Sequence, residues 1–224
     1  MDYPLIVLSG GQDSTTCLLW ALEKYEQPPK AIIFNYGQKH LIEIKQAQLI
    51  CWILNIEYEV LEIGKVFENS ALVNHGMDIN QAHPENPELP ASFVPGRNAL
   101  FLTIAFAHAF NHGYNKVITG VNETDYSGYP DCRSEFINSM ERSLQLATDR
   151  YDIMIVTPLI DKSKAEIWKM ANDLGKLEFI VEHTHTDYNG NRDERHDWGY
   201  GKLDNPASRI RKEGFEQAKE KGWI

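Results

Sequence analysis

A glycine-rich turn joins a short apolar run to a helix-forming segment at the start of the chain. The run covers residues 5–8, the turn is Ser9-Gly10-Gly11-Gln12-Asp13, and Ser14 opens a stretch with apolar residues at helical spacing. Such a unit directs free backbone amides and the positive end of a helix dipole to one place, which suits a phosphate group. Because glycine has no side chain, Gly10 and Gly11 would let the backbone approach an anion closely.

The amino-acid sequence of this turn distinguishes it from other phosphate loops. It is not a Walker loop, because the Gly-Lys-Ser/Thr ending of that motif is absent. The order Ser-Gly-Gly-x-Asp-Ser resembles the pyrophosphatase loop of the ATP pyrophosphatases, which cleave ATP between its α and β phosphates. The alternative is an ordinary tight turn with a serine cap. The match in a strand-to-helix context favours the phosphate loop.

Short apolar runs alternate with helix-periodic segments along most of the chain. The expected strands cover 5–8, 31–35, 58–62, 116–120 and 153–156, and the expected helices cover 14–25, 40–54, 97–111, 133–147 and 164–174. Continuous apolar runs are typical of buried parallel strands. The pattern predicts a doubly wound α/β fold with a parallel five-stranded sheet. Ligands of such folds bind outside the carboxyl ends of the strands.

Two segments interrupt this alternation. Residues 64–95 are polar and contain several prolines, and loops of this length are typical of lids or disordered insertions. Residues 182–224 are rich in charge, histidine and aromatic side chains, with one expected helix over about 206–221. We therefore expect a nucleotide-binding domain over 1–181, interrupted by a lid-like insertion, and a short C-terminal appendage.

Composition limits the class of protein and its partners. The chain has 224 residues, enough for one sizeable core, and no apolar run approaches the roughly 20 residues that span a bilayer. An immediate first strand and three cysteines without paired spacing lead us to expect no signal peptide, no disulfide framework and a cytoplasmic location. The net charge of −10 argues against broad nucleic-acid contact. A phosphate site must then be locally positive or assisted by a metal ion.

Further motifs follow the other expected strands. They occupy residues 35–40, 93–98, 118–133, 175–177 and 184–190. Together with the phosphate loop they resemble the 7-cyano-7-deazaguanine synthases of the queuosine and archaeosine pathways, over about residues 5–190. The segment 127–133 is the most discriminating part, because other ATP pyrophosphatases lack it.

The resemblance implies a carbon–nitrogen ligase that uses ATP and Mg²⁺. ATP would adenylate the carboxylate of 7-carboxy-7-deazaguanine, ammonia would displace AMP, and a second ATP would convert the amide to the nitrile, 7-cyano-7-deazaguanine. In-line attack at phosphorus needs its extra negative charge neutralised, so the protein's task is positioning and charge stabilisation. A homodimer is a candidate assembly.

The resemblance also suggests residue roles around the nucleotide. Ser9, Gly10, Gly11, Asp13 and Ser14 would hold the pyrophosphate, Phe34, Asn35, Tyr36 and Gly120 would flank the rest of the ATP, and Arg97 and Lys164 would be catalytic. Asp13 would cap the helix or orient Mg²⁺. Lys162 competes with Lys164 for the phosphate role, and the alternative for Arg97 is a surface salt bridge.

The deazaguanine has an edge rich in hydrogen-bond donors, so a carboxylate, which accepts hydrogen bonds, is suited to bind it. The candidates are Glu123, Asp125 and Asp131, with Phe93, Tyr126 and Tyr129 for stacking and Gly128 for a turn that lets the backbone bond the heterocycle. For each tyrosine, plain core packing is an equal alternative. Cys132 is better interpreted as a small buried residue than as a nucleophile.

The tail departs from the family in one respect. The family carries four cysteines that hold a structural zinc ion. Here Asp187 stands at the first of these positions, Asn205 and Ser208 stand at later ones, and no cysteine follows Cys132. We expect no structural zinc and a tail held by packing of aromatic residues, namely Trp198, Tyr200, Phe215 and Trp223. A substitute site of His183, His185, His196 and Asp187 is the alternative.

Other functions stay open on the sequence alone. With an altered tail, the reaction could end at the amide, or the activated base could pass to another acceptor. A tRNA-thiolating enzyme would need a catalytic cysteine pair and a basic appendage, which the acidic composition disfavours. A catalytically silent ATP-binding module is the alternative from another class, and the intact loop with Arg97 and Lys164 argues against it.

Overall fold

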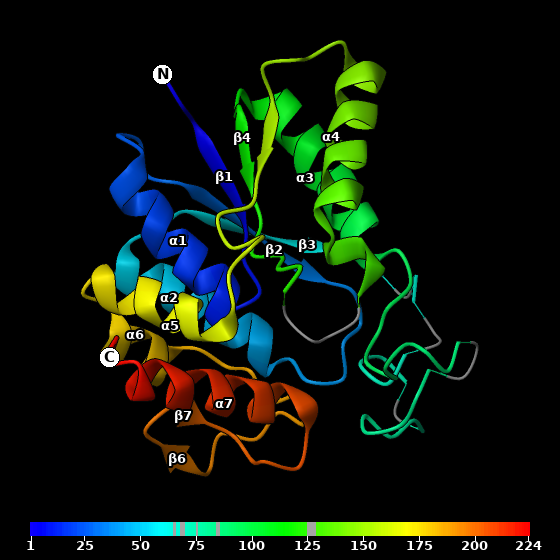
Figure 1. The fold of residues 1–224 in the computed structure, drawn as a ribbon. Coiled ribbons are helices and arrows are strands. Elements are labelled where there is room, and N and C mark those ends of the chain that lie inside the picture. The colour runs from blue at the N-terminus through cyan, green and yellow to red at the C-terminus, as the bar shows by residue number, and fades with distance from the viewer. Residues whose placement is uncertain (65, 68–69, 75, 84–85, 125–128) are drawn as a thin grey trace.

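A parallel five-stranded sheet forms the centre of the molecule (Figure 1). The computed structural model describes residues 1–64, 66–67, 70–74, 76–83, 86–124 and 129–224. The strands are β1 (Pro4–Val7), β2 (Lys30–Asn35), β3 (Tyr58–Glu62), β4 (Lys116–Ile118) and β5 (Met154–Val156), in the spatial order β3-β2-β1-β4-β5. Every pairing between them is parallel. The predicted doubly wound α/β fold is therefore confirmed.

Successive strand residues face opposite helical layers, as the two-residue period of a strand requires. Ile6 and Ile33 pack with the layer of α1, α2 and α5, whereas Leu5 and Ile32 pack with α3 and α4. The helices are α1 (Gln12–Lys24), α2 (Ile42–Leu54), α3 (Arg97–His112), α4 (Ser134–Thr148) and α5 (Lys164–Asp173). Because both faces are covered, the strands are apolar throughout, which is why the sequence shows them as continuous runs.

The helix ends follow local chemistry. α2 and α3 are followed by Asn55 and Gly113, both in the left-handed conformation that often terminates a helix. α5 begins with a capping box, in which the Ser163 hydroxyl accepts from the Glu166 amide and the Glu166 carboxylate accepts from the Ser163 amide. Among the helices that the structure describes, none combines the length and the apolar composition needed to cross a membrane.

The order of the strands places a crevice beside β1. The chain runs from β1 outward through β2 and β3, and then returns to place β4 and β5 on the other side of β1. Loops after β1 and β4 therefore meet at the carboxyl edge of the sheet, at the point where ligands bind in such folds. The contact is close, because a Cβ at Gly120 would lie 2.8 Å from the Ser14 nitrogen.

The described residues of the insertion between β3 and α3 form a small apolar cluster of their own. Ala71, Leu72, Ile79, Ala91 and Val94 are buried together, and an isolated bridge joins Ala82 to Pro90. The insertion also supplies one wall of the cavity described below. Its action as a lid stays a prediction.

The C-terminal segment adds a further layer against α5. It contains α6 (Leu177–His183), the short strands β6 (Arg195–His196) and β7 (Gly199–Tyr200), which pair antiparallel, and α7 (Pro206–Glu220). Helix α7 was predicted, and Asn205 caps its N-terminus, where the Asn205 side chain accepts a hydrogen bond from the Ser208 amide. Trp168 of α5 contacts Phe215 edge-to-face at 5.1 Å between ring centres. The tail thus shares an apolar cluster with α5.

Candidate active site

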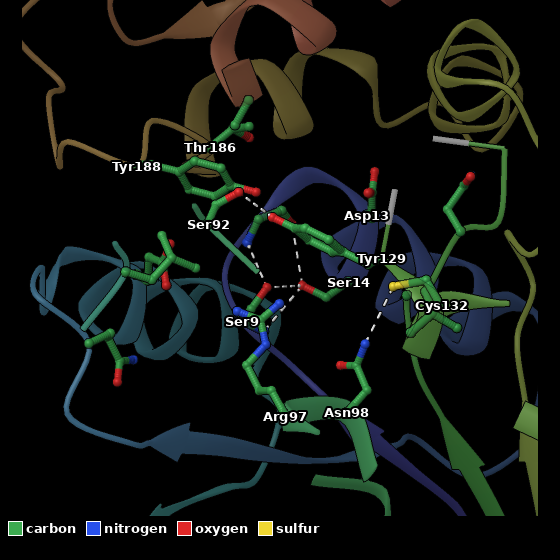
Figure 2. A pocket seen from close by; sticks show the side chains of 18 of the residues that line it. Ser9, Asp13, Ser14, Ser92, Arg97, Asn98, Tyr129, Cys132, Thr186 and Tyr188 are labelled. Atoms are coloured by element: carbon green, nitrogen blue, oxygen red, sulfur yellow. Dashed lines mark hydrogen bonds between the residues drawn. The ribbon is translucent and has the colours of Figure 1, made fainter. Parts of the chain in front are cut away.

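A cavity of about 640 Å³ opens at the carboxyl ends of β1, β2 and β4 (Figure 2). It brings together most of the described residues that the sequence suggested for ATP and substrate. These are Ser9, Gly11, Asp13, Ser14, Phe34, Tyr36, Arg97, Gly120, Tyr129 and Lys164. Gly10, Asn35, Phe93, Glu123 and Asp131 do not line it, and Asp125, Tyr126 and Gly128 lie outside the described residues.

The phosphate loop is held by hydrogen bonds among its own hydroxyl groups. The Ser9 and Ser14 hydroxyl oxygens lie 3.0 Å apart, and the Ser9 amide donates to the Ser14 hydroxyl at 3.2 Å. No side chain caps the N-terminus of α1, where Gly11 occupies the cap position. Free amides and the helix dipole at such an uncapped end favour an anion.

The two glycines of this loop have different roles. Gly10 has a φ of +80°, and a Cβ on it would lie 2.7 Å from both the Ala47 nitrogen and the Glu43 carbonyl oxygen of α2. Gly11 has a φ of −78°, and a Cβ there would make ordinary contacts. Gly10 is thus required for close packing on α2, and its close approach to an anion stays a prediction.

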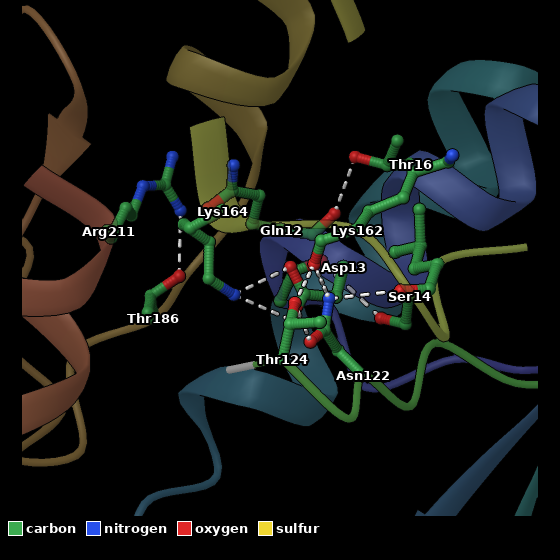
Figure 3. Close-up of polar contacts among 12 residues, drawn as sticks. Gln12, Asp13, Ser14, Thr16, Asn122, Thr124, Lys162, Lys164, Thr186 and Arg211 are labelled. Carbon is green, nitrogen blue, oxygen red and sulfur yellow. Dashed lines mark hydrogen bonds and ion pairs between the residues drawn. The ribbon is translucent and has the colours of Figure 1, made fainter. Parts of the chain in front are cut away.

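Both cationic side chains that the sequence suggested as catalytic reach the cavity, from different elements. The Lys164 ammonium of α5 lies 3.0 and 2.9 Å from the two carboxylate oxygens of Asp13 (Figure 3). Arg97 of α3 donates to the Tyr36 hydroxyl at 3.4 Å and faces the cavity (Figure 2). The rival Lys162 lies 3.9 Å from Asp161 and does not line the cavity. This arrangement supplies local positive charge in an acidic protein.

Of the residues suggested to flank the adenine, Phe34 and Tyr36 line the cavity and Asn35 does not. Phe34 stacks on Phe101 at 4.3 Å between ring centres, and both line the cavity with Tyr36. Asn35 instead donates to the Glu62 carboxylate at 2.9 Å, at the end of β3. The alternation of side chains along a strand explains why the middle residue is not a cavity residue.

Two carboxylates suggested for base recognition cap helices. Glu123 accepts from the Ser134 amide at 3.0 Å at the start of α4, and hydrogen bonds from Ser134 lower the pKa of Glu123. Asp131 accepts from the Asn98 amide at 3.1 Å in the first turn of α3. A sequence shows a carboxylate but not the amide that comes near it after folding. The role of Glu123 and Asp131 in base recognition stays a prediction.

Of the two tyrosines expected to stack on the base, Tyr129 lies in the cavity wall, and Tyr126 lies outside the described residues. Tyr129 lines the cavity, and its hydroxyl lies 2.6 Å from the Ser92 hydroxyl. Phe93 lies behind Tyr129, with 5.7 Å between the ring centres. Cys132 also lines the cavity, where it accepts from the Asn98 amide group at 3.4 Å. Burial raises the pKa of the Cys132 thiol to about 12, so it is protonated near neutral pH and is a poor nucleophile.

Three residues of the tail that the sequence did not suggest for the site belong to this cavity. Thr186, Tyr188 and Arg211 all line it. Arg211 is buried and donates to the Thr184 and Thr186 hydroxyls at 2.7 and 2.8 Å, and burial lowers its pKa to about 9. Nothing in the sequence near Arg211 indicates which residues it would contact after folding.

Gln12 is a second missed residue. It lies inside the phosphate-loop motif, is 3% exposed and lines the cavity. Neither its amide nitrogen nor its amide oxygen has a hydrogen-bond partner among the described residues. A buried amide without partners costs free energy, so a bound ligand or water would stabilise it.

Polar residues form a hydrogen-bonded network at the positions where the resemblance led us to look for zinc ligands. The buried Asp187 carboxylate accepts from the Asn189 and Lys202 amides, each at 2.7 Å. A Cβ at Gly201 would lie 3.0 Å from both the Asp187 carboxylate and the Ser208 hydroxyl. Within the described residues, no group of three or more His, Cys, Asp or Glu side chains could hold a metal ion.

The three tail histidines make separate contacts. His183 packs on Phe179, His185 bonds the Asp187 carbonyl oxygen, and His196 stacks on Trp198. Trp198 and Phe215 are buried, as expected for a tail held by packing, whereas Tyr200 and Trp223 are partly exposed.

We expect purified protein to hold no zinc after dialysis and to keep its melting temperature in EDTA. The reason is that carboxylate, amide and hydroxyl groups bonded to the backbone replace thiolates, which are strong zinc ligands. Elemental analysis and thermal unfolding with and without EDTA measure this. One zinc ion per chain that survives dialysis would contradict it and would point to His183, His185 and His196.

Gly214 of α7 lies directly on the cavity lysine. A Cβ at Gly214 would collide with Lys164 Cγ and would be 2.7 Å from Lys164 Cβ. We expect Gly214→Ala to displace Lys164, to destabilise the fold by about 1–3 kcal/mol and to lower ATP use by about tenfold or more. Gly222→Ala is the control. It also costs stability, because alanine is strained at its φ of +65°, but nothing lies near its Cβ position and it does not contact Lys164. Equal activity in the two variants would refute the coupling of α7 to Lys164.

Comparison with known proteins agrees with this arrangement. The family model described as "Queuosine biosynthesis protein QueC" matches residues 4–219. A 7-cyano-7-deazaguanine synthase of Wolinella succinogenes is 45% identical over 219 residues, which are 96% of this chain and 93% of the relative. One from Clostridium botulinum is 43% identical over 213 residues, with 94% and 93% covered.

Solved structures show the same fold at low sequence identity. NMN synthetase from Francisella tularensis has a TM-score of 0.50 and 16% identity, and the match covers 98% of this chain and 86% of that one. The family match spans nearly the whole chain, and close relatives carry one name. The chain therefore belongs to the 7-cyano-7-deazaguanine synthase family of queuosine biosynthesis proteins.

Proposed function

We propose that this enzyme converts 7-carboxy-7-deazaguanine and ammonia into 7-cyano-7-deazaguanine at the expense of two molecules of ATP. The observation that carries the proposal is the meeting of the uncapped phosphate loop with Lys164 and Arg97 in one cavity. The names of the relatives give the product. The substrate, the adenylation and the use of ammonia are the finer parts of the proposal.

The residues act on successive groups along the ATP. The free amides of the loop and the Ser9 and Ser14 hydroxyls bind the departing pyrophosphate. Lys164 and Arg97 balance the charge that builds on the α-phosphorus as the substrate carboxylate oxygen attacks and pyrophosphate leaves. Asp13 is the loop carboxylate whose oxygens suit Mg²⁺ that arrives with the nucleotide, and that ion would supply further charge neutralisation.

Ammonia then attacks the carbonyl carbon of the acyl adenylate, AMP leaves, and one proton is released to give the amide. In the second round the amide oxygen attacks the α-phosphorus of a new ATP and pyrophosphate leaves. Loss of AMP and of the amide protons gives the nitrile. The same groups can serve both rounds, because each round places an oxygen nucleophile opposite a pyrophosphate leaving group.

Mass spectrometry of the product tests the proposal. The protein is incubated with 7-carboxy-7-deazaguanine, ATP, Mg²⁺ and ammonium, and AMP and pyrophosphate are counted against the product. We expect the nitrile with two AMP for each product molecule. An amide with one AMP indicates a variant that stops early, and a new adduct indicates another acceptor. Absence of substrate-dependent AMP indicates a silent nucleotide-binding module.

A further inference from the structure

The carboxylates that line the described part of the cavity have different environments. Asp13 is paired with Lys164, and Glu88 is exposed on the insertion. Glu43, in the first turn of α2, is half-buried. Among the described residues, no hydrogen bond or ion pair to the Glu43 side chain is found within bonding distance. Its acceptor oxygens are therefore available to a ligand.

The setting of Glu43 is aromatic and carries one nearby cation. Its carbonyl oxygen lies against Gly10 of the phosphate loop, so the side chain starts beside the ATP site. The charged and titratable groups that face the carboxylate are Arg97 of α3, Tyr36 after β2 and Tyr188 of the tail. Burial raises the pKa of Glu43 to about 7, and the charge of Arg97 opposes that rise.

A neutral heterocycle with adjacent donors matches this setting. The six-membered ring of a deazaguanine presents a ring N–H next to an exocyclic amino group, and one carboxylate can accept from both. Tyr36, Tyr129 and Tyr188 supply aromatic surface in the same cavity. An ammonium ion is a poorer match, because the Arg97 charge repels it.

We infer that Glu43 accepts hydrogen bonds from the ring N–H and the amino group of the deazaguanine, and that it determines the base specificity of this site. The sequence suggested Glu123 and Asp131 for that task, but both bond free amides at helix starts. This inference rests on the proposed function, since it identifies the residue that recognises the base of the proposed substrate.

The test compares two substrates. One is 7-carboxy-7-deazaguanine, and the other is its analogue without the exocyclic amino group. Pyrophosphate release gives kcat/KM for each. Wild-type protein is expected to prefer the amino compound by about tenfold or more, because the analogue leaves a carboxylate oxygen unpaired. In Glu43→Gln the amide offers one acceptor, so the preference falls below about threefold while KM for ATP is unchanged.

Two further measurements separate this role from a structural one. In wild-type protein, KM for the deazaguanine should fall as the pH rises through about 7, because only ionised Glu43 accepts both bonds. Glu43→Gln should lose that dependence. Glu43→Asp keeps the acceptors and should retain the preference at a lower kcat/KM. The control Glu23→Gln, at an exposed site on α1, should keep both the preference and the pH profile.

The contrary outcomes are distinct. If Glu43→Gln keeps the wild-type preference, the inference is wrong. If it keeps the preference and pyrophosphate release but loses amide formation, Glu43 serves the ammonia step instead. If wild-type protein releases no pyrophosphate with either compound, the proposed function itself fails, and the inference fails with it.

Discussion

Gly10→Ala is expected to nearly abolish ATP-dependent pyrophosphate release. The new Cβ would meet the backbone of α2 at Ala47 and Glu43, at 2.7 Å in each case, and a helix backbone cannot move aside cheaply. The positive φ adds strain, since side chains rarely adopt it. Overpacking and strain together cost about 2–5 kcal/mol. The loop would leave its position, and we expect kcat/KM for ATP to fall by at least about 100-fold.

Gly11→Ala is the matched control for this prediction. Its φ is −78°, and the nearest atoms to a Cβ are the Ser9 hydroxyl at 3.4 Å and the His185 carbonyl oxygen at 3.5 Å. We expect the free energy of unfolding to change by less than about 1 kcal/mol. Thermal unfolding and pyrophosphate release are measured for both variants. Equal destabilisation by the two substitutions would show that contact with α2 is not what requires Gly10.

Lys164→Met is expected to lower kcat/KM for ATP by about 100- to 1000-fold. This is the usual loss when one group that stabilises transition-state charge is removed. Lys164 is partly buried and forms an ion pair with Asp13 of the phosphate loop (Figure 3). Without the ammonium, the Asp13 carboxylate would repel the bound phosphates. KM for the deazaguanine should change less than kcat, because the lysine acts on the phosphate end of the reaction.

Lys162→Met tests the same region without touching the cavity. The Lys162 side chain lies near Asp161 and is not a cavity residue, while its carbonyl oxygen accepts from Asn122, a bond that the substitution keeps. We expect kcat/KM within about threefold of wild type. The assignment of the phosphate lysine would be reversed if Lys162→Met lost activity and Lys164→Met kept it.

Elements with strong local signals were predictable from the sequence. All five strands and the helices of the α/β core were predicted, with ends within about two residues of those observed, because apolar period and turn residues act locally. Helix α6 and the β6–β7 hairpin were not predicted. Helix α6 has seven residues and strands β6 and β7 have two each, which is too short for a periodic signal. Whether an element could be predicted therefore depended on its length and its periodicity more than on its composition.

The candidate site divides in the same way. The phosphate loop could be predicted because its residues are consecutive and its function depends on backbone amides. The carboxylate that we propose to bind the base could not be chosen from the sequence. A carboxylate looks the same there whether it caps a helix, as Asp131 does, or lies in a cavity, as Glu43 does. Which of these happens depends on the amides that folding brings near it.

By itself, the sequence determined the parallel sheet, the phosphate loop and the family. These follow from local pattern and from motifs that remain recognisable without coordinates. The tertiary structure alone decided which partners meet across long separations, such as Lys164 with Asp13 and Gly214 with Lys164. The physical reason is that the order of the strands, and the packing of α7 on α5, set these contacts.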